Sequence, residues 1–215
     1  TQCFYPNIGG IEALMTGMAT AMHSAGKDLL VVADGKNDES DKIKTYSIKR
    51  FGGWKPIRRI KKARYISQLC KTSNIEAIYA DSWKSIEYLK NVNIPIFVLA
   101  HGTEIQKNIN SLNFYKILKQ KRIFSSYGNS KQIIANSNYT KELIKASLNI
   151  DADKICVIHP GIDIYEKFIQ NYTILKIKNI INNSYPVLLT LARLELRKGH
   201  KIVLQALSSL IDKFP

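Results

Sequence analysis

Two adjacent glycines, Gly9 and Gly10, stand directly before a stretch in which apolar residues recur at the spacing of one helical face. A helix N-terminus offers free backbone N–H groups and a partial positive charge. Glycine has no Cβ that would keep a phosphate or a sugar away from these groups. A simple loop that needs a positive φ is the alternative explanation. The apolar face consists of Ile11, Leu14, Met15, Met18 and Met22.

A histidine and a glutamate form a second candidate for chemistry. His101 and Glu104, in the segment AHGTE, follow an apolar run of strand length at residues 94–100. A histidine at this point either lines a ligand site or bonds a backbone group. Glu104 has the position of a residue that caps the segment after it.

Short apolar runs alternate with helical patterns along most of the chain, which predicts βαβ units and a parallel sheet. The fold class is therefore α/β, a Rossmann-like parallel sheet with helices on both faces. Ligands bind such sheets at the carboxyl ends of the strands, where the glycine pair and His101 are expected. The predicted strands are residues 29–33, 43–48, 77–80, 94–100, 133–136 and 154–158, and the predicted helices after the first are residues 57–72, 83–90, 113–127 and 139–148.

The pattern loosens after residue 160, which predicts more than one domain. We expect a first domain over residues 1–165, a polar connection over 166–185, and the incomplete start of a second Rossmann-like domain over 186–215. In that last part, residues 186–194 read as a strand and residues 200–214 as a helix. The first residues, TQCFYP, read as the tail of a strand, so we expect further residues before Thr1.

Composition excludes several classes of protein. The 215 residues are 45% apolar, but no run of about 18 apolar residues is present, so no membrane-spanning helix is expected. Three widely spaced cysteines exclude a full disulfide framework, disfavour a zinc site and suit reduced thiols in a cytosolic protein. The dinucleotide fingerprint, the P-loop and the HExxH motif do not occur. We predict no metal site, because the DxD-like Asp151 and Asp153 fall at the wrong end of the sheet for chemistry.

The net charge of +15 attracts polyanions, and residues 49–64, KRFGGWKPIRRIKKAR, carry eight of the basic side chains. One interpretation is contact with an anionic membrane, where each Lys or Arg contributes about 1 kcal/mol and an aromatic ring seats at the interface. Contact with nucleic acid and a solvated basic helix are the alternatives. The residues that would face the membrane are Arg50, Trp54, Lys55, Arg58, Arg59, Lys61 and Lys62.

Five segments, in order, give the chain a resemblance to a known family. They are FYPNIGGIEALMTGMATAMHSAGKDLLVVA, AHGTEI, IIANSNYTKELI, KICVIHPGID and VLLTLARLELRKGHKIVLQAL. Their order and separation resemble those of the retaining glycosyltransferases with a GT-B fold, called group 1 or family 4, over nearly the whole chain. The resemblance implies two Rossmann-like domains with an active site between them. It also implies transfer of a sugar from a nucleotide-sugar, with retention and without a metal ion or other cofactor.

The resemblance further assigns roles to individual residues. Gly9 and Gly10 match the glycine-rich loop that approaches the diphosphate of the donor and the acceptor. His101 matches a catalytic histidine beside the transferred sugar. Arg193 and Lys198, in ARLELRKG, match a basic pair that neutralises the departing nucleoside diphosphate, which suits a guanidinium fork and an ammonium point charge.

Two further residues, Asn7 and Glu104, are assigned to the acceptor side. Ala192 stands where the family usually has glycine, and its methyl group would push the backbone away from the phosphates. The paired glutamates of the family would fall after Pro215. We therefore expect this chain alone to bind a donor weakly and to turn over little, and micromolar binding of UDP or GDP would contradict that expectation.

The predicted function is transfer of a sugar to a glycan or lipid-linked acceptor, in the synthesis of a surface polysaccharide or lipopolysaccharide. The predicted partners are the donor, the acceptor and an anionic membrane surface, with no nucleic acid. The predicted location is the cytoplasm, with peripheral contact at the inner face of the membrane. A basic module that binds nucleic acid or membrane without catalysis is one alternative. Another GT-B enzyme, such as a nucleotide-sugar epimerase, is the second.

Overall fold

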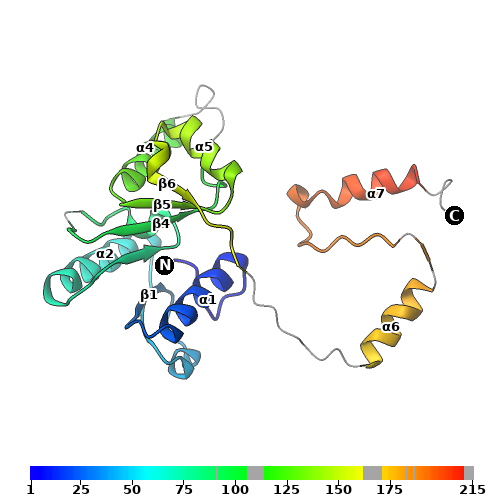
Figure 1. The fold of residues 1–215 in the computed structure, drawn as a ribbon, viewed down its shortest axis with the longest axis horizontal. Helices are drawn as coiled ribbons and strands as arrows, with labels where there is room; N and C mark the ends of the chain where they lie inside the picture. The colour runs from blue at the N-terminus through cyan, green and yellow to red at the C-terminus, as the bar shows by residue number, and fades with distance from the viewer. Residues whose placement is uncertain (91, 106–113, 162–170, 183, 186, 211–215) are drawn as a thin grey trace. The chain divides into compact units, whose positions relative to one another are not determined.

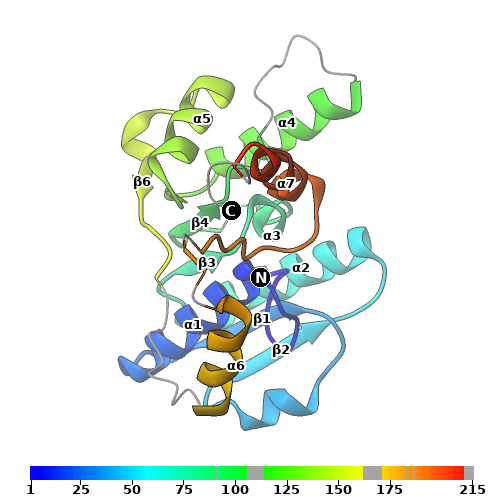
Figure 2. The same cartoon turned by 90° about the vertical axis from the view of Figure 1, so that its right-hand side faces the viewer.

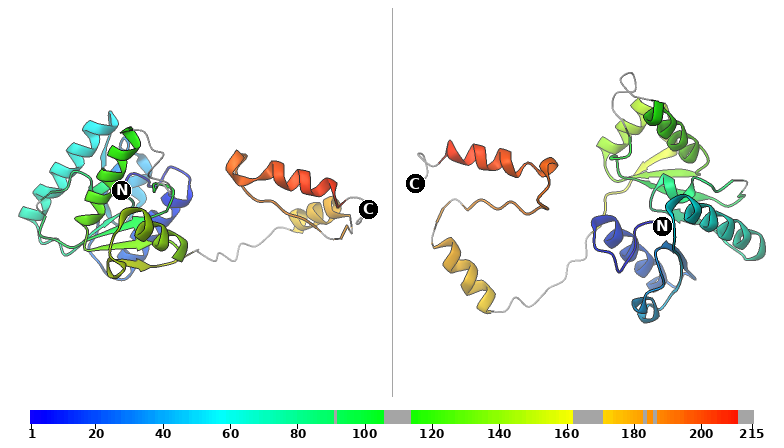
Figure 3. Two further views of the ribbon diagram at one scale, coloured as in Figure 1. Left: turned by 90° about the horizontal axis from the view of Figure 1, so that it is seen from above. Right: turned by 180° about the vertical axis from the view of Figure 1, so that it is seen from behind.

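A computed structural model gives the fold in two compact units, Thr1–Ile162 and Asp163–Pro215, which are described separately. In Figures 1 and 3 the first unit runs from blue to yellow and the second from amber to red. The structure describes residues 1–90, 92–105, 114–161, 171–182, 184–185 and 187–210.

The first unit contains parallel strands in two sheets. One sheet pairs β1 (Leu30–Asp34) with β2 (Ser47–Phe51). The other has the order β3-β4-β5-β6, and each of its neighbouring pairs is parallel. Its strands are β3 (Ile78–Ala80), β4 (Ile96–Ala100), β5 (Gln132–Ala135) and β6 (Ile155–Val157).

Helices connect these strands, as the alternation of patterns predicted. They are α1 (Gly10–Ser24), α2 (Lys55–Thr72), α3 (Trp83–Ile86), α4 (Phe114–Gly128) and α5 (Asn138–Leu148), with short 3-10 turns at Glu39–Ile43 and Ala152–Lys154. Side-chain caps decide where some of them start. At α5, for example, the hydroxyl of Ser137 accepts a hydrogen bond from the backbone N–H of Thr140 at 3.2 Å.

The apolar core lies on both faces of the four-stranded sheet, as expected for parallel strands. Val98 and Ala100 of β4 belong to a cluster with Ile123 of α4 and Ile144 of α5. Leu99, which points to the opposite face, belongs to a second cluster with Met15 and Ala19 of α1. Helices α4 and α5 therefore cover one face and α1 the other, as Figures 1 and 2 show.

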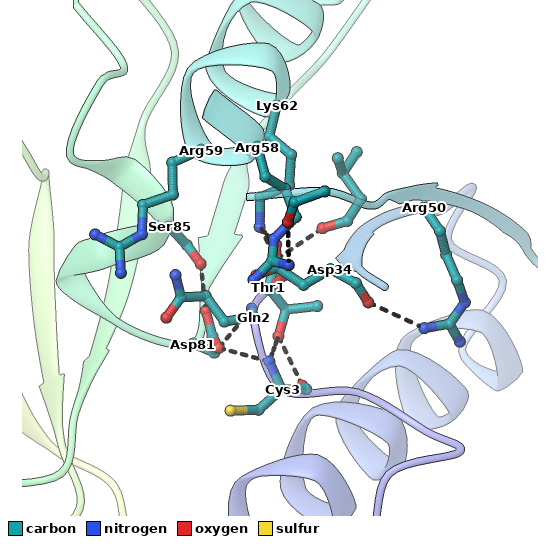
Figure 4. A network of polar contacts seen from close by, with 12 residues as sticks. Thr1, Gln2, Cys3, Asp34, Arg50, Arg58, Arg59, Lys62, Asp81 and Ser85 are labelled. Carbon is teal, nitrogen blue, oxygen red and sulfur yellow. Dashed lines mark hydrogen bonds and ion pairs between the residues drawn. The ribbon is translucent and has the colours of Figure 1, made fainter. Parts of the chain in front are cut away.

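The segment Thr1–Cys3 touches both sheets. The N-terminal amino group of Thr1 donates to the backbone oxygen of Val32 in β1 at 2.8 Å. The next two backbone N–H groups, of Gln2 and Cys3, donate to the carboxylate of Asp81 after β3, at 2.8 and 3.1 Å. Three residues thus connect the two sheets of the unit (Figure 4).

Three predicted elements differ from the structure. The strand predicted at 43–48 begins at Ser47, because Ile43 belongs to the preceding 3-10 turn. Asp38 caps this turn, and its carboxylate accepts from the Ser40 N–H at 2.9 Å. The helix predicted at 83–90 ends at Ile86. Residues 187–194 form no strand within the described part of the chain, since a strand requires a hydrogen-bonded neighbour.

The second unit contains α6 (Asn171–Ile181), a 3-10 turn at Leu196–Lys198, and α7 (His200–Ser208). Within its described residues no side chain is buried, and Leu189 and Leu191 are 83% and 91% exposed. Over the described ranges of the whole chain, no helix is both long enough and apolar enough to cross a bilayer.

Candidate functional site

The glycine pair lies at the N-terminus of α1, where no side chain caps the helix. Gly9 has an extended backbone with φ 175°, and neither glycine is in the left-handed region. A Cβ added at Gly10 would meet no atom within 4 Å, and at Gly9 it would meet only the carboxylate of Glu12. The explanation by a turn with positive φ is therefore wrong, and nothing in the described structure requires glycine at position 10.

Asn7 lies in the turn that leads to these glycines. Its backbone N–H donates to the carbonyl oxygen of Phe4 at 3.3 Å, and its side chain is exposed. Phe4 is buried in the core beside α1, so the turn is anchored on one side while Asn7, Gly9 and Gly10 face outward.

His101 is the first residue after β4 and is oriented by the end of β3. Its Nε2 lies 2.9 Å from the backbone oxygen of Asp81. A carbonyl oxygen only accepts hydrogen bonds, so Nε2 carries a proton and Nδ1 is the nitrogen left for another group. The histidine thus bonds a backbone group, as one interpretation of the sequence proposed, and still presents a ring nitrogen at the carboxyl edge of the sheet.

Glu104 holds the loop that carries His101. One of its carboxylate oxygens accepts from the His101 backbone N–H at 3.1 Å and from the hydroxyl of Tyr127 at 2.7 Å. Burial and the nearby negative charge of Glu104 raise the pKa of Tyr127 well above its usual range. One oxygen of the Glu104 carboxylate is therefore occupied by structural hydrogen bonds within the fold.

Gly102 makes a close approach inside the same loop. Its φ is +81°, and a Cβ there would stand 2.8 Å from the Thr140 hydroxyl oxygen of α5. That hydroxyl donates to the side-chain oxygen of Asn136 at 2.7 Å. The loops after β4 and β5 consequently pack against each other, and a side chain at position 102 would push them apart.

Asp81 organises this edge of the sheet and was missed by the sequence reasoning. It is 1% exposed, and its carboxylate accepts from the backbone of Gln2 and Cys3 and from the Ser85 hydroxyl, the last at 2.6 Å. The signal was available, because Asp81 follows the run AIYA as directly as His101 follows IPIFVLA. Each is the first polar residue after a buried strand.

The predicted membrane-facing set is wrong for Arg50 and Lys62, which are buried. Arg50 donates through Nε and Nη2 to the two carboxylate oxygens of Asp41, each at 2.6 Å, and also bonds the backbone oxygen of Tyr5. Lys62 pairs with Asp34 at 2.5 Å. Buried cations need such partners, and these partners are distant in sequence.

Arg58 and Arg59 are also mostly covered. Arg58 pairs with Asp34 at 2.7 Å, and Arg59 pairs with Glu87 at 3.2 Å. In Figure 4, Arg58 reaches toward Asp34, whereas Arg59 extends to the other side, past Ser85. The predicted residues that remain exposed are Trp54, Lys55 and Lys61.

Arg193 and Lys198 lie in the second unit. Arg193 pairs with Glu195 at 3.1 Å and is 74% exposed, and its backbone oxygen lies 2.9 Å from Nε2 of His200. Lys198 is exposed, one residue before Gly199, which precedes the first turn of α7. Arg193 thus precedes a short 3-10 turn, and Lys198 is the last residue of that turn, two residues before α7 begins.

Two grooves formed by described residues of the first unit lie away from His101 and the glycine pair. The larger, of about 530 Å³, follows the second half of α2, away from the carboxyl edge of the sheet. It is lined by Ile60, Ala63, Arg64, Ser67, Gln68, Lys71, Tyr88 and Lys90. Within the residues that the structure describes, no group of three or more His, Cys, Asp or Glu side chains could hold a metal ion.

Comparison with solved structures confirms the predicted α/β fold. A glycosyltransferase from Rickettsia africae ESF-5 is similar over 94% of this chain, with 19% identity and a TM-score of 0.66. Anabaena Alr3699/HepE, solved in complex with UDP and glucose, is similar over 97% of this chain, with 17% identity and a TM-score of 0.65. The chain spans about half the length of these structures, 54% and 56%.

Comparison with curated proteins gives no match. The family model described as Glycosyltransferase Family 4 matches residues 8–166. This match covers most of the chain, including the glycine pair, Asp81 and the His101 loop, and the chain therefore belongs to Glycosyltransferase Family 4.

Proposed function

We propose that the protein transfers a sugar from a nucleotide-sugar donor to a glycan or lipid-linked acceptor, with retention of the anomeric configuration. Family membership supports the transfer of a sugar. The similar Anabaena protein was solved with UDP and glucose, which makes UDP-glucose a reasonable probe donor. Synthesis of a surface polysaccharide or lipopolysaccharide is the setting that the proposal favours.

The observation that carries the proposal is the unexplained glycine at position 10. In a helix interior glycine is about 1 kcal/mol worse than alanine, and at a helix start residues with a capping side chain are preferred to glycine. Yet Gly10 begins a helix without a positive φ and without a neighbour within 4 Å of an added Cβ. A ligand that comes close to the backbone supplies the missing reason, and the uncapped N–H groups of α1 suit a diphosphate.

His101 is proposed to orient the transferred sugar. Its ring is held through Nε2 by the Asp81 carbonyl, so Nδ1 would accept a hydrogen bond from a sugar hydroxyl. A reacting group held in one orientation reacts faster because less entropy is lost in the transition state. The role is one of positioning through direct contact with the donor sugar.

Arg193 and Lys198 are proposed to neutralise the departing nucleoside diphosphate. In a front-face transfer the acceptor oxygen bonds to the anomeric carbon as the bond from that carbon to the diphosphate breaks, and the acceptor proton passes to the leaving oxygen. Negative charge therefore grows on the diphosphate. A guanidinium, an ammonium group and the first N–H groups of α7 can stabilise that charge without a metal ion.

Two measurements test this proposal. UDP is titrated into the chain while backbone amides are followed by NMR, and we expect weak binding that shifts Gly10, Ile11 and Lys198. An absence of shifts up to about 10 mM, weaker than any useful affinity, would contradict donor binding. Labelled UDP-glucose is then incubated with and without an extract of glycans and lipid-linked sugars. Label on the extract supports transfer, and an altered donor sugar without the extract indicates an epimerase.

We also propose that Trp54, Lys55 and Lys61 make peripheral contact with an anionic membrane. Trp54 is 72% exposed, Lys55 follows it directly, and Lys61, about two helical turns further along α2, is exposed as well. Two cations contribute about 2 kcal/mol near anionic lipid, so sedimentation with anionic liposomes should be weak and should vanish at high salt. Protein that stays in the supernatant at low salt would contradict this part.

A further inference from the structure

Helices α2, α3 and α4 carry four basic residues near their N-terminal ends, and the charges of three of them act on the fourth, Lys84. We call them the Lys84 cluster: Lys55, Arg59, Lys84 and Lys119. Lys55 is the first residue of α2 and Arg59 lies one turn later, while Lys84 is the second residue of α3. Lys119 is in the first half of α4. Helices α2 and α3 begin just after β2 and β3, so this is the edge that carries His101.

The cluster is held in place by a buried tryptophan and one carboxylate. The ammonium group of Lys84 lies 5.8 Å from the centre of the Trp83 ring, and the Arg122 guanidinium lies 5.6 Å from it. Glu87 pairs with both Arg59 and Arg122. One negative charge therefore faces two guanidinium groups, and its carboxylate is nearly buried.

The positive charges of the cluster destabilise one another. Lys84 is half-buried, and burial lowers its pKa, with Arg59, Lys119 and Lys55 lowering it further. The Nε–H of Arg59 is buried and has no hydrogen-bond partner among the described residues. Such an arrangement is unfavourable in the free protein and becomes favourable when an anion is bound.

We propose that the Lys84 cluster binds a phosphate or diphosphate group of the acceptor. This inference rests on the proposed function, in which Gly9, Gly10, Arg193 and Lys198 serve the donor diphosphate. The cluster is a separate set of cations on elements next to the His101 loop: the Asp81 carbonyl that holds His101 is three residues before Lys84. A second set of cations fits a second anion, so the acceptor is a phosphorylated sugar or a diphosphate-linked lipid.

Inorganic pyrophosphate is the first probe, titrated into the 215-residue chain with NMR detection. We expect the amides of residues 82–85 to shift, and Lys84→Gln to weaken binding at these residues about tenfold, as for loss of one charged hydrogen bond. Lys119→Gln should weaken it as well. The melting temperature of Lys84→Gln should stay the same or rise, because a repulsion is removed.

Lys71→Gln is the matched control, because Lys71 lies on α2 in the groove away from this edge. It removes the same charge and should change affinity less than twofold. Equal weakening by Lys71→Gln and Lys84→Gln would mean that the overall positive field attracts pyrophosphate, and would overturn the proposal. Unshifted amides at 82–85 would overturn it too.

The source of the phosphate is separated by two ligands, glucose 6-phosphate and geranyl diphosphate, each compared with its unphosphorylated alcohol. Either phosphorylated compound binding at Lys84 supports the cluster, and equal binding of the alcohols opposes it. UDP binding is measured on the same variants. If UDP does not bind while pyrophosphate binding still depends on Lys84, the proposed donor site is overturned and the Lys84 cluster is supported. If UDP binds and Lys84→Gln binds pyrophosphate as tightly as wild type does, the donor site stands and the proposal for the Lys84 cluster is overturned.

Discussion

The Nε2 nitrogen of His101 lies 2.9 Å from the backbone oxygen of Asp81, which connects the end of β4 to the end of β3. The hydrogen bond fixes one ring nitrogen as a donor and leaves Nδ1 facing away from the Asp81 carbonyl. Because the partner is a backbone atom, substitution of the Asp81 side chain alone would not remove it. The orientation of His101 therefore depends on where the loop after β3 sits.

Replacing His101 with alanine should lower the reaction rate strongly and the free energy of unfolding only slightly. We expect a decrease in the rate of UDP release from UDP-glucose of about 100-fold, through loss of orientation. The free energy of unfolding should fall by only about 1 kcal/mol, through loss of one hydrogen bond. His159→Ala is the control, since His159 is an exposed histidine after β6. Equal rates for the two variants would contradict the role of His101.

Gly10→Ala should stabilise the fold and weaken the site. Alanine fits the helical backbone and meets no atom within 4 Å, so the free energy of unfolding should rise by up to about 1 kcal/mol. UDP binding should weaken, because the new methyl group occupies the ligand's approach. Gly17→Ala, inside α1 and equally free of neighbours, should stabilise the fold at least as much, with unchanged UDP binding. If both variants bind UDP alike, the glycine has no role in the site.

Asp41→Asn should reduce stability in a pH-dependent way. The hydrogen bond from Arg50 lowers the pKa of Asp41 below its usual value. The pair therefore contributes stability above about pH 4, and this contribution is lost as the pH falls through the lowered pKa. At pH 6 the variant should lose about 3 kcal/mol, because the buried Arg50 charge is left unpaired, and the difference from wild type should shrink in acid.

Urea unfolding at pH 6, 4 and 2.5 measures this difference. Glu39→Gln is the control, since the Glu39–Lys42 pair is exposed and should contribute less than about 0.5 kcal/mol. A pH-independent difference between Asp41→Asn and wild type would show that the ion pair is not the cause.

Gly102→Ala should loosen the loop that carries His101. Both the positive φ and the 2.8 Å approach to the Thr140 hydroxyl oppose a side chain, so we expect a loss of about 1–3 kcal/mol in thermal unfolding. Gly128→Ala, at the last residue of α4, has neither constraint and should be neutral or stabilising by up to about 1 kcal/mol. Adding Thr140→Ala to Gly102→Ala should recover the steric part but not the backbone part. Additive losses in the double variant would mean that the two residues do not interact.

The sequence predicted the alternation of strands and helices well, because buried parallel strands and amphipathic helices leave local patterns. It could not show that Arg50 and Lys62 are buried, since their partners Asp41 and Asp34 come from other elements. The helical spacing of Lys62 beside Ala63 and Ile66, both in contact with the core, was a usable hint. The strand predicted at 186–194 was wrong for a different reason. An apolar run does not reveal whether another strand is available to pair with it.

One residue joins two parts of the proposed site mechanically. The carboxylate of Asp81 accepts hydrogen bonds from the backbone of Gln2 and Cys3, and Cys3 lies six residues before Gly9. The carbonyl oxygen of Asp81 bonds the His101 ring. A displacement of the Gly9 loop by a bound ligand would therefore act on Asp81, the residue whose carbonyl oxygen orients the His101 ring. In the proposed function, donor binding at the Gly9 loop and the orientation of the His101 ring would therefore both depend on the position of Asp81.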